Sequence, residues 1–310
     1  MITTTSVLCQ LPKEWKSRGI GGGGAMFALS INPNNPSEFY AGCDMSNLFH
    51  SADGGRSYNV LSYRDVNGGH NSSVRFTSVP GLLYVVSYKL NGNVDQVAPA
   101  KSTDGGNTWQ ALPGVSDPSE ETYSLYVDYY FPNRVMMSTY STVYWSSDGG
   151  STFAAIHQAA DNGSGVVVGG ALLSGDTVIV GTNDGLITST NAGATFTLST
   201  PAGIVAGEKI FSFAAGWSNG AINAVCITAK SNVFVGLQPW EYNGQADNVY
   251  TMSGWGSPFV RRDAFVDGRE FPMMVAMSVQ NARAMYIGGS SSAAPMVKKS
   301  TDGGLTWKSV

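Results

Sequence analysis

Carboxylates that recur at one position of a repeated motif are the first residues in this sequence that could do chemistry. The motif is Ser-x-Asp-Gly-Gly-x-Ser/Thr followed by an aromatic residue, and residues 102–109 are a complete copy. The recurring position is occupied, in chain order, by Asp53, Asp104, Asp148, Asn191 and Asp302. An aspartate in such a motif either takes part in catalysis or accepts hydrogen bonds from its own turn.

The local chemistry of the motif favours the second role. Asp-Gly-Gly between β-rich runs predicts a tight turn, because glycine adopts positive φ and the carboxylate accepts bonds from nearby backbone N–H groups. The Ser and Thr hydroxyls add local hydrogen bonds, and the aromatic residue anchors the turn in the core. The motif resembles the Asp-box, or BNR repeat, whose aspartates are structural and lie on the outside of propeller blades. We therefore expect all five residues to be structural.

Repetition of the motif also predicts the architecture. Short β runs without helical periodicity separate the copies, and each unit has the length of about 40 residues that is typical of a propeller blade. We expect an all-β fold, a single β-propeller of four-stranded antiparallel blades, over residues 15–310 after an N-terminal extension, 1–14. The expected blades span about 24–62, 73–112, 121–157, 165–199, 208–262 and 271–310.

Two parts of this scheme are irregular. No copy of the motif lies between Asn191 and Asp302, so the fifth blade is degenerate; we count six blades, and a second hidden blade within 200–270 would make seven. Trp15-Lys16-Ser17 repeats the Trp-Lys-Ser sequence at 307–309. Residues 15–18 are therefore expected to form an outermost strand that closes the ring and removes the free edge of a sheet.

Composition excludes several classes of function. The 310 residues carry a formal net charge of −4 and no run of Lys and Arg, which argues against nucleic-acid binding. No window approaches the roughly 18 consecutive apolar residues of a membrane-spanning helix. The three cysteines are widely spaced, and His50, His70 and His157 are isolated, so we expect neither a metal site nor another cofactor.

The opening of the chain resembles glycoside hydrolase family 74. The likeness rests on Gly21–Gly24, on the turn at 31–36 with Pro33 and Pro36, and on Tyr40-Ala41-Gly42-Cys43-Asp44 before the next strand. The family consists of xyloglucan-active enzymes built from two seven-bladed propellers that face each other across a cleft. The resemblance implies that Asp44 corresponds to the general base.

An inverting hydrolase also needs a carboxylic acid about 6.5–9.5 Å from that base. The family takes this acid from its second propeller, which 310 residues do not contain, and Met45-Ser46-Asn47 departs from the family's small Gly-Gly. Asp44 is therefore either half of a catalytic pair or a turn residue that bonds its own backbone. The carboxylates that could face it are Asp65, Asp95, Asp128 and Asp263.

Sialidases resemble this chain more distantly. They also combine Asp-boxes with a six-bladed propeller, but their Phe/Tyr-Arg-Ile-Pro motif is absent. The arginine triad of a sialidase would have to come from Arg75, Arg134, Arg261, Arg262 and Arg269. The Arg261-Arg262 pair could grip a carboxylate through paired hydrogen bonds, and the alternative is a solvated turn.

Aromatic residues in the degenerate blade form the remaining candidate site, a glycan-binding surface. They are Trp217, Trp240, Tyr242 and Trp255, set among Gly, Asn and Gln residues. Flat aromatic faces stack on sugar rings, and loops on a rigid scaffold often carry function. Large aromatic residues also fill gaps between propeller blades, so that alternative stays open.

Two classes of function remain. The first is a non-catalytic module that recognises a polysaccharide or serves as a structural or receptor-binding part. The second is an endo-acting β-glucan hydrolase with Asp44 as base and an acid from another propeller domain or another copy of the chain. The missing second carboxylate favours recognition. No signal peptide is visible at the N-terminus, yet the composition is typical of an extracellular protein, so we expect an extracellular or virion-associated location.

Overall fold

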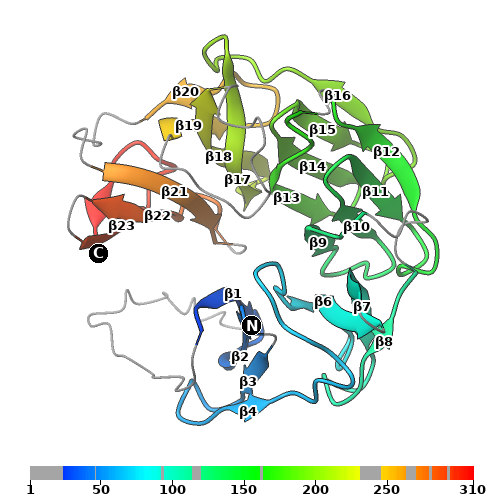
Figure 1. The fold of residues 1–310 in the computed structure, drawn as a ribbon. Helices are drawn as coiled ribbons and strands as arrows, with labels where there is room; N and C mark the ends of the chain where they lie inside the picture. The colour runs from blue at the N-terminus through cyan, green and yellow to red at the C-terminus, as the bar shows by residue number, and fades with distance from the viewer. Residues whose placement is uncertain are drawn as a thin grey trace, which may run out of the picture.

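The computed structural model of the chain describes residues 24–45, 47–91, 94–113, 120–160, 163–230, 246–262, 270–278, 281–291 and 294–310. This part of the chain forms 24 β-strands, and it contains no helix that could cross a membrane. The strands are grouped in six four-stranded antiparallel sheets, arranged as blades around a common centre (Figure 1). The expected all-β propeller of four-stranded antiparallel blades is confirmed, with six blades.

The strands of each blade follow the chain from the centre of the propeller outwards (Figure 1). Blades 1 to 3 comprise β1 (Met26–Asn32), β2 (Asn35–Cys43), β3 (Leu48–Ser51), β4 (Asn59–Val60); β5 (Arg75–Phe76), β6 (Leu83–Asn91), β7 (Val94–Ser102), β8 (Gln110–Ala111); and β9 (Ser124–Val127), β10 (Val135–Ser138), β11 (Thr142–Ser146), β12 (Ala154–Gln158). Blades 4 to 6 comprise β13 (Val168–Ser174), β14 (Thr177–Thr182), β15 (Gly185–Ser189), β16 (Thr197–Ser199); β17 (Glu208–Ser218), β18 (Ala221–Lys230), β19 (Ala246–Ser253), β20 (Val260–Arg261); and β21 (Glu270–Met277), β22 (Met285–Ser291), β23 (Ala294–Ser300), β24 (Lys308–Ser309).

The middle strands are the most apolar, because each blade is covered on both faces by its neighbours. β10 reads Val-Met-Met-Ser and is buried throughout, and β14 is buried at five of its six positions. The core is divided into clusters at the interfaces between successive blades; one joins Tyr40 of blade 1 to Leu83 and Val85 of blade 2. Fully burying one such aliphatic side chain contributes about 1.5–3 kcal/mol.

The repeated turns connect the third strand to the fourth in blades 1, 2, 3, 4 and 6. Their two central residues have positive φ, as at Gly105 (75°) and Gly106 (87°), which glycine adopts without steric cost. The Gly105 N–H also donates to the Gly81 carbonyl, in the loop between the first two strands of the same blade (3.0 Å). Both kinds of loop therefore lie on one face of the propeller, which we call the turn face.

Blade 5 departs from this repeat. Its first two strands, with 11 and 10 residues, are the longest in the described part of the chain. A turn with Gly254 and Gly256 at φ of 88° and 85° takes the place of the motif, and the Gly254 N–H donates to the Ile222 carbonyl (3.0 Å).

The two chain ends were expected to meet in the closing blade. Blade 6 takes its outer strand, β24, from the residues after the last repeated turn. The expected extension 1–14 and the closing strand 15–18 lie outside the described residues.

Candidate functional site

The carboxylate of each repeated turn accepts hydrogen bonds from its own turn. In blade 2, Asp104 Oδ1 accepts from the Ser102 hydroxyl (2.8 Å) and the Thr108 N–H (2.9 Å), and Oδ2 accepts from the Thr108 hydroxyl (2.6 Å). The same three contacts recur at Asp53, Asp148 and Asp302. Asn191 keeps the Oδ1 contacts, while its amide nitrogen donates to Thr195 Oγ1 (2.9 Å).

These hydrogen bonds keep the carboxylates ionised. The threonine hydroxyl and N–H groups lower the pKa of Asp104 and Asp148 to about 2, and the Ser57 N–H and hydroxyl do the same for Asp53. Desolvation works in the opposite direction at Asp302, but the Thr306 contacts outweigh it and lower the pKa to about 2. A carboxylate bonded in this way is suited to holding a turn and poorly suited to accepting a proton near neutral pH.

Asp44 follows β2 on the face opposite to the turn face. Its Oδ1 accepts the Ala25 N–H (2.9 Å), and its own N–H donates to the Ala25 carbonyl (3.2 Å), so the residue joins the start of β1 to the end of β2. A Cβ atom at Gly24 would lie 2.4 Å from the same Oδ1. The contacts of Asp44 thus run to the neighbouring strand rather than within its own turn.

The structure describes only some of the carboxylates that could face Asp44. Asp128 follows β9 on the turn face, where its Oδ1 accepts the N–H groups of Tyr130 (3.0 Å) and Phe131 (3.1 Å). Asp65 lies between blades 1 and 2 and its N–H donates to the Ser62 carbonyl (3.0 Å). Asp263 and the side chain of Asp95 lie outside what the structure describes.

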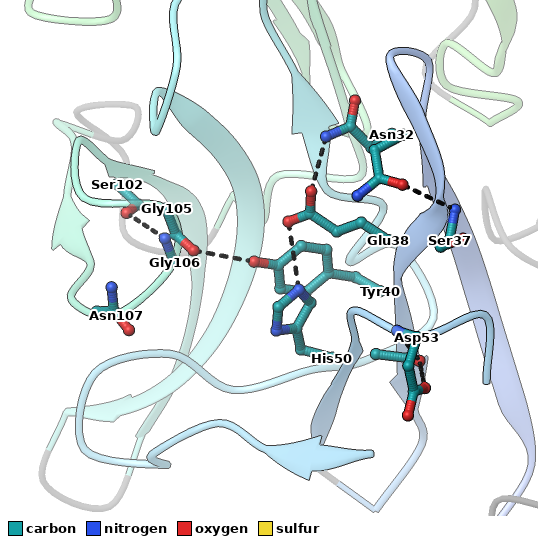
Figure 2. Close-up of polar contacts among 12 residues, drawn as sticks. Asn32, Ser37, Glu38, Tyr40, His50, Asp53, Ser102, Gly105, Gly106 and Asn107 are labelled. Atoms are coloured by element: carbon teal, nitrogen blue, oxygen red, sulfur yellow. Dashed lines mark hydrogen bonds and ion pairs between the residues drawn. The ribbon is translucent and has the colours of Figure 1, made fainter. Parts of the chain in front are cut away.

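Figure 2 shows a polar cluster on blade 1 that sequence reasoning missed. Glu38 Oε2 accepts from the Asn32 amide (2.7 Å), and Glu38 Oε1 lies 3.3 Å from His50 Nε2. The His50 ring stacks on Tyr40 with the centroids 4.4 Å apart. Tyr40 in turn reaches the repeated turn of blade 2, so this pair of ionisable groups is part of the interface between two blades.

A second histidine–carboxylate pair ties three blades together. His157 Nε2 of blade 3 lies 2.8 Å from Asp184 Oδ2 of blade 4, and the Ala160 N–H donates to the same oxygen (2.9 Å). Lys209 of blade 5 places its Nζ 3.9 Å from Asp184 Oδ1. Burial would raise the pKa of Asp184, but the bonds from His157 and Ala160 and the nearby positive charges lower it.

A pocket of about 250 Å³ opens on the turn face where four blades approach one another. Its lining residues are Pro33 and Asn34 of blade 1, Tyr129 and Tyr130 of blade 3, Leu172, Leu173 and Ser174 of blade 4, and Ala215, Gly216 and Trp217 of blade 5. Each of these segments either forms the end of an innermost strand or directly follows one. The four strands are β1, β9, β13 and β17, and they surround the centre of the propeller (Figure 1). We call this space the axial pocket.

Hydrogen bonds and ring packing hold the aromatic walls of the axial pocket. The Trp217 indole N–H donates to Ser174 Oγ on the neighbouring blade (3.1 Å). The Asn34 amide donates to the Tyr129 hydroxyl, and the Tyr129 and Tyr130 rings meet edge to face with the centroids 5.0 Å apart. Trp217 is 40% exposed and Tyr130 71% exposed, so aromatic surface is available to a ligand.

The predicted aromatic residues do not gather at one place. Trp217 lines the axial pocket, whereas Trp255 lies in the turn between β19 and β20 and is not part of the pocket wall. Trp240 and Tyr242 lie outside the described residues. Sequence reasoning missed Tyr129 and Tyr130; the signal for them was the aromatic run at 129–131 directly after an inner strand.

A metal ion was not expected from the sequence. Among the described residues, no group of three or more His, Cys, Asp and Glu side chains is arranged to hold one. Cys43 and Cys226 are buried thiols, and burial raises the pKa of the Cys226 thiol.

Comparison with known proteins identifies the fold of this chain but does not assign it to a family. No protein-family model matches the sequence, and no curated protein matches it. Among solved structures, the GH74 xyloglucanase from Xanthomonas campestris is similar over 96% of this chain and 47% of its own chain, with a TM-score of 0.67 and 16% identity. The present chain thus spans about half the length of that enzyme.

Two other solved structures are similar over most of their own length. YCF48 from Cyanidioschyzon merolae is similar over 96% of this chain and 88% of its own, with a TM-score of 0.59 and 15% identity. A structure of YCF48 bound to D1 peptide is similar over 92% of this chain and 82% of its own, with a TM-score of 0.58 and 14% identity. At these identities the likeness shows the β-propeller fold.

Proposed function

We propose that this chain is a non-catalytic recognition propeller that binds a polysaccharide at the axial pocket. The observation that carries the proposal is Trp217, whose indole is held by Ser174 while much of its ring stays exposed beside Tyr129 and Tyr130. Sugar rings stack their C–H faces on such aromatic surfaces, and a few well-placed polar groups then fix their orientation. The Asn34 amide and the Ser174 hydroxyl are polar groups hydrogen-bonded to these aromatic side chains.

The proposal gives the remaining predicted residues structural roles. The carboxylates of the repeated turns hold those turns, and Asp44 joins β1 to β2. Because the chain spans 47% of the xyloglucanase, a second propeller domain or another copy of this chain is a suitable partner. An extracellular or virion-associated location belongs to the same proposal, since structural polysaccharides occur outside the cell.

Three alternative functions would use different residues or release different products. A family 74-like inverting hydrolase would use Asp44 as general base with an acid from a partner propeller. A sialidase-like enzyme would release sialic acid. A peptide-binding propeller, suggested by the structure of YCF48 with D1 peptide, would use the same exposed aromatic residues to hold apolar side chains.

The test is a binding and turnover screen with xyloglucan, mixed-linkage glucan and sialylated oligosaccharides on the full chain. Binding of a glucan without release of product is expected, with Trp217→Ala weakening it by about tenfold or more, as for loss of a stacked aromatic hot spot. Tyr63→Ala is the matched control, because Tyr63 is 68% exposed and lies outside the axial pocket.

The other outcomes separate the alternatives. Release of oligosaccharide that disappears in Asp44→Asn would replace the proposal with the hydrolase, and release of sialic acid would replace it with the sialidase-like enzyme. Binding of unrelated peptides with no binding of any glycan would favour the peptide module.

A further inference from the structure

A second groove lies on the turn face between blades 5 and 6. Its volume is about 310 Å³, larger than that of the axial pocket. At the interfaces of blades 1 and 2 and of blades 2 and 3, the hydroxyls of Tyr40 and Tyr84 reach the repeated turn of the next blade. Between blades 5 and 6 the residues beside the turn are small, and the groove takes up the space. They include Ala221, Asn223, Thr251 and Ser253.

Two arginines bring positive charge to this groove from opposite blades. Arg262 follows β20 of blade 5, and Arg283 lies between the first two strands of blade 6. The only hydrogen bond that the Arg262 guanidinium makes with the described residues runs from Nε to Thr251 Oγ1, at 3.4 Å. The Arg283 side chain makes none with them, while its backbone is held by the Asn281 side chain and by Gly303. Most of the N–H donors of both guanidinium groups are therefore available in the described part of the molecule.

A side-chain amide without a partner among the described residues also lines the groove. Asn223 is 7% exposed and lines the groove, yet its side chain makes no hydrogen bond with any residue that the structure describes. A ligand in the groove can therefore supply an acceptor or a donor to this amide.

The charge of the groove favours an anion. Its ionisable lining residues are Arg262, Arg283 and Asp302. The Asp302 oxygens accept hydrogen bonds from Ser300 and Thr306 within their own turn. Two arginines against one aspartate give the lining a net charge of +1. Arginine forks match the planar geometry of a carboxylate through paired N–H···O bonds.

The groove and the axial pocket flank one hairpin, formed by β17 and β18. On one side Trp217 faces Ser174 of blade 4; on the other, the Ser218 hydroxyl donates to Asn281 of blade 6 (3.4 Å). Ser218 and Asn219 line the groove, directly after the residue that lines the axial pocket. A chain-like ligand that crosses this hairpin would meet aromatic rings first and arginines next.

We propose that the groove between blades 5 and 6 binds the carboxylate of an acidic sugar, so that the ligand of this propeller is a uronic-acid-containing polysaccharide. The inference rests on the proposed glycan binding and specifies its substrate class. Arg262 and Arg283 bind the carboxylate, Asn223 bonds a neighbouring oxygen, and the axial pocket holds a sugar ring elsewhere on the same chain.

The test compares an oligogalacturonate with its methyl ester, which has the same sugars without the charges. Calorimetry on the full chain should show at least about tenfold tighter binding of the acid at low salt, the scale of a charge-assisted hydrogen bond, and a smaller difference at high salt. The Arg262→Gln/Arg283→Gln double variant should lose this preference and still bind the ester. Arg64→Gln, which removes an exposed charge between blades 1 and 2, is the control.

The other outcomes distinguish the acidic ligand from glycan recognition in general. Equal binding of acid and ester, weakened by Trp217→Ala, overturns the acidic ligand and leaves glycan recognition standing. Binding of the acid that depends on the arginines and not on Trp217 supports the groove and overturns the axial pocket as a site. Failure of the acid, the ester and the neutral glucans to bind overturns both.

Discussion

The hydroxyl group of Tyr40 in blade 1 donates a hydrogen bond to the carbonyl oxygen of Gly105 in blade 2, over 3.3 Å (Figure 2). Tyr40 is fully buried, and burial raises the pKa of its phenol, so the hydroxyl keeps its proton. Tyr84 repeats the arrangement one blade later, with contacts to the carbonyls of Pro132 (3.0 Å) and Gly149 (3.5 Å). In blades 2 and 3, the repeated turn therefore closes its own hairpin and also accepts a hydrogen bond from the preceding blade.

Removing the Tyr40 hydroxyl should therefore weaken the contact between two blades. We expect Tyr40→Phe to lower the free energy of unfolding by about 1 kcal/mol, because the hydrogen bond to the Gly105 carbonyl is lost while the aromatic packing remains. Denaturant unfolding measures the change. Tyr63→Phe alters an exposed ring and should leave the midpoint unchanged; an equal effect of both variants would contradict the role of the contact.

The two glycines of the repeated turn in blade 2 are required for different reasons. An added Cβ at Gly105 meets nothing within 4 Å, whereas one at Gly106 would lie 2.5 Å from the Tyr40 hydroxyl. Gly105→Ala should cost about 1–2 kcal/mol, the strain of a left-handed alanine, and Gly106→Ala should cost more. Thermal unfolding of the two variants side by side tests the order, and the reverse order would contradict it.

Blade 4 offers the opposite experiment. Ala192 occupies the first glycine position of its turn with a φ of 61°, a conformation that strains residues with a Cβ atom. We expect Ala192→Gly to raise the free energy of unfolding by about 1 kcal/mol, because glycine adopts this conformation without steric strain. A loss of stability would contradict this expectation. It would show that the extra conformational entropy of glycine in the unfolded chain outweighs the relief of strain in the folded turn.

Acid should weaken the repeated turns. The pKa values of Asp53, Asp104, Asp148 and Asp302 fall from 3.8 to about 2 in the folded protein. A lowered folded-state pKa stabilises the fold above the unfolded value, so this contribution is complete above pH 3.8 and is lost as the pH falls towards 2. Unfolding titrations across that window should show falling stability, and Asp104→Asn should make the slope shallower, since an amide does not titrate. Asn191 shows that an amide can hold the turn.

The pair of His157 and Asp184 should matter more than the nearby lysine. The Asp184 side chain is 2% exposed and lies 2.8 Å from His157 Nε2, but 3.9 Å from the ammonium group of the partly exposed Lys209 side chain. We expect His157→Ala to cost about 1–3 kcal/mol, because it removes a partner of a buried carboxylate, and Lys209→Ala to cost about 0–1 kcal/mol. Equal losses in denaturant unfolding would show that charge alone, without the short contact, determines the stability.

The repeated turns and the blade architecture could be predicted because their determinants are local. Asp-Gly-Gly with flanking hydroxyl groups satisfies its own hydrogen bonds within eight residues, so the sequence of one copy already specifies its shape. Five such copies, separated by short apolar runs, then imply stacked four-stranded sheets. The fifth blade was predicted from the interval between motif copies and from the apolar runs within it, and its Gly254–Gly256 turn shows that another glycine pair can serve the same position.

The sites depend on which blades become neighbours. Asn34, Tyr129, Ser174 and Trp217 come from four blades and meet only where the ends of the innermost strands surround the propeller centre. The arginine groove likewise exists because small residues of blade 5 face the turn of blade 6. By itself the sequence determined the turns, the strands and the all-β class, through short-range hydrogen bonds and apolar runs. The tertiary structure alone decided where aromatic rings and charges gather, because packing of whole blade faces sets those distances.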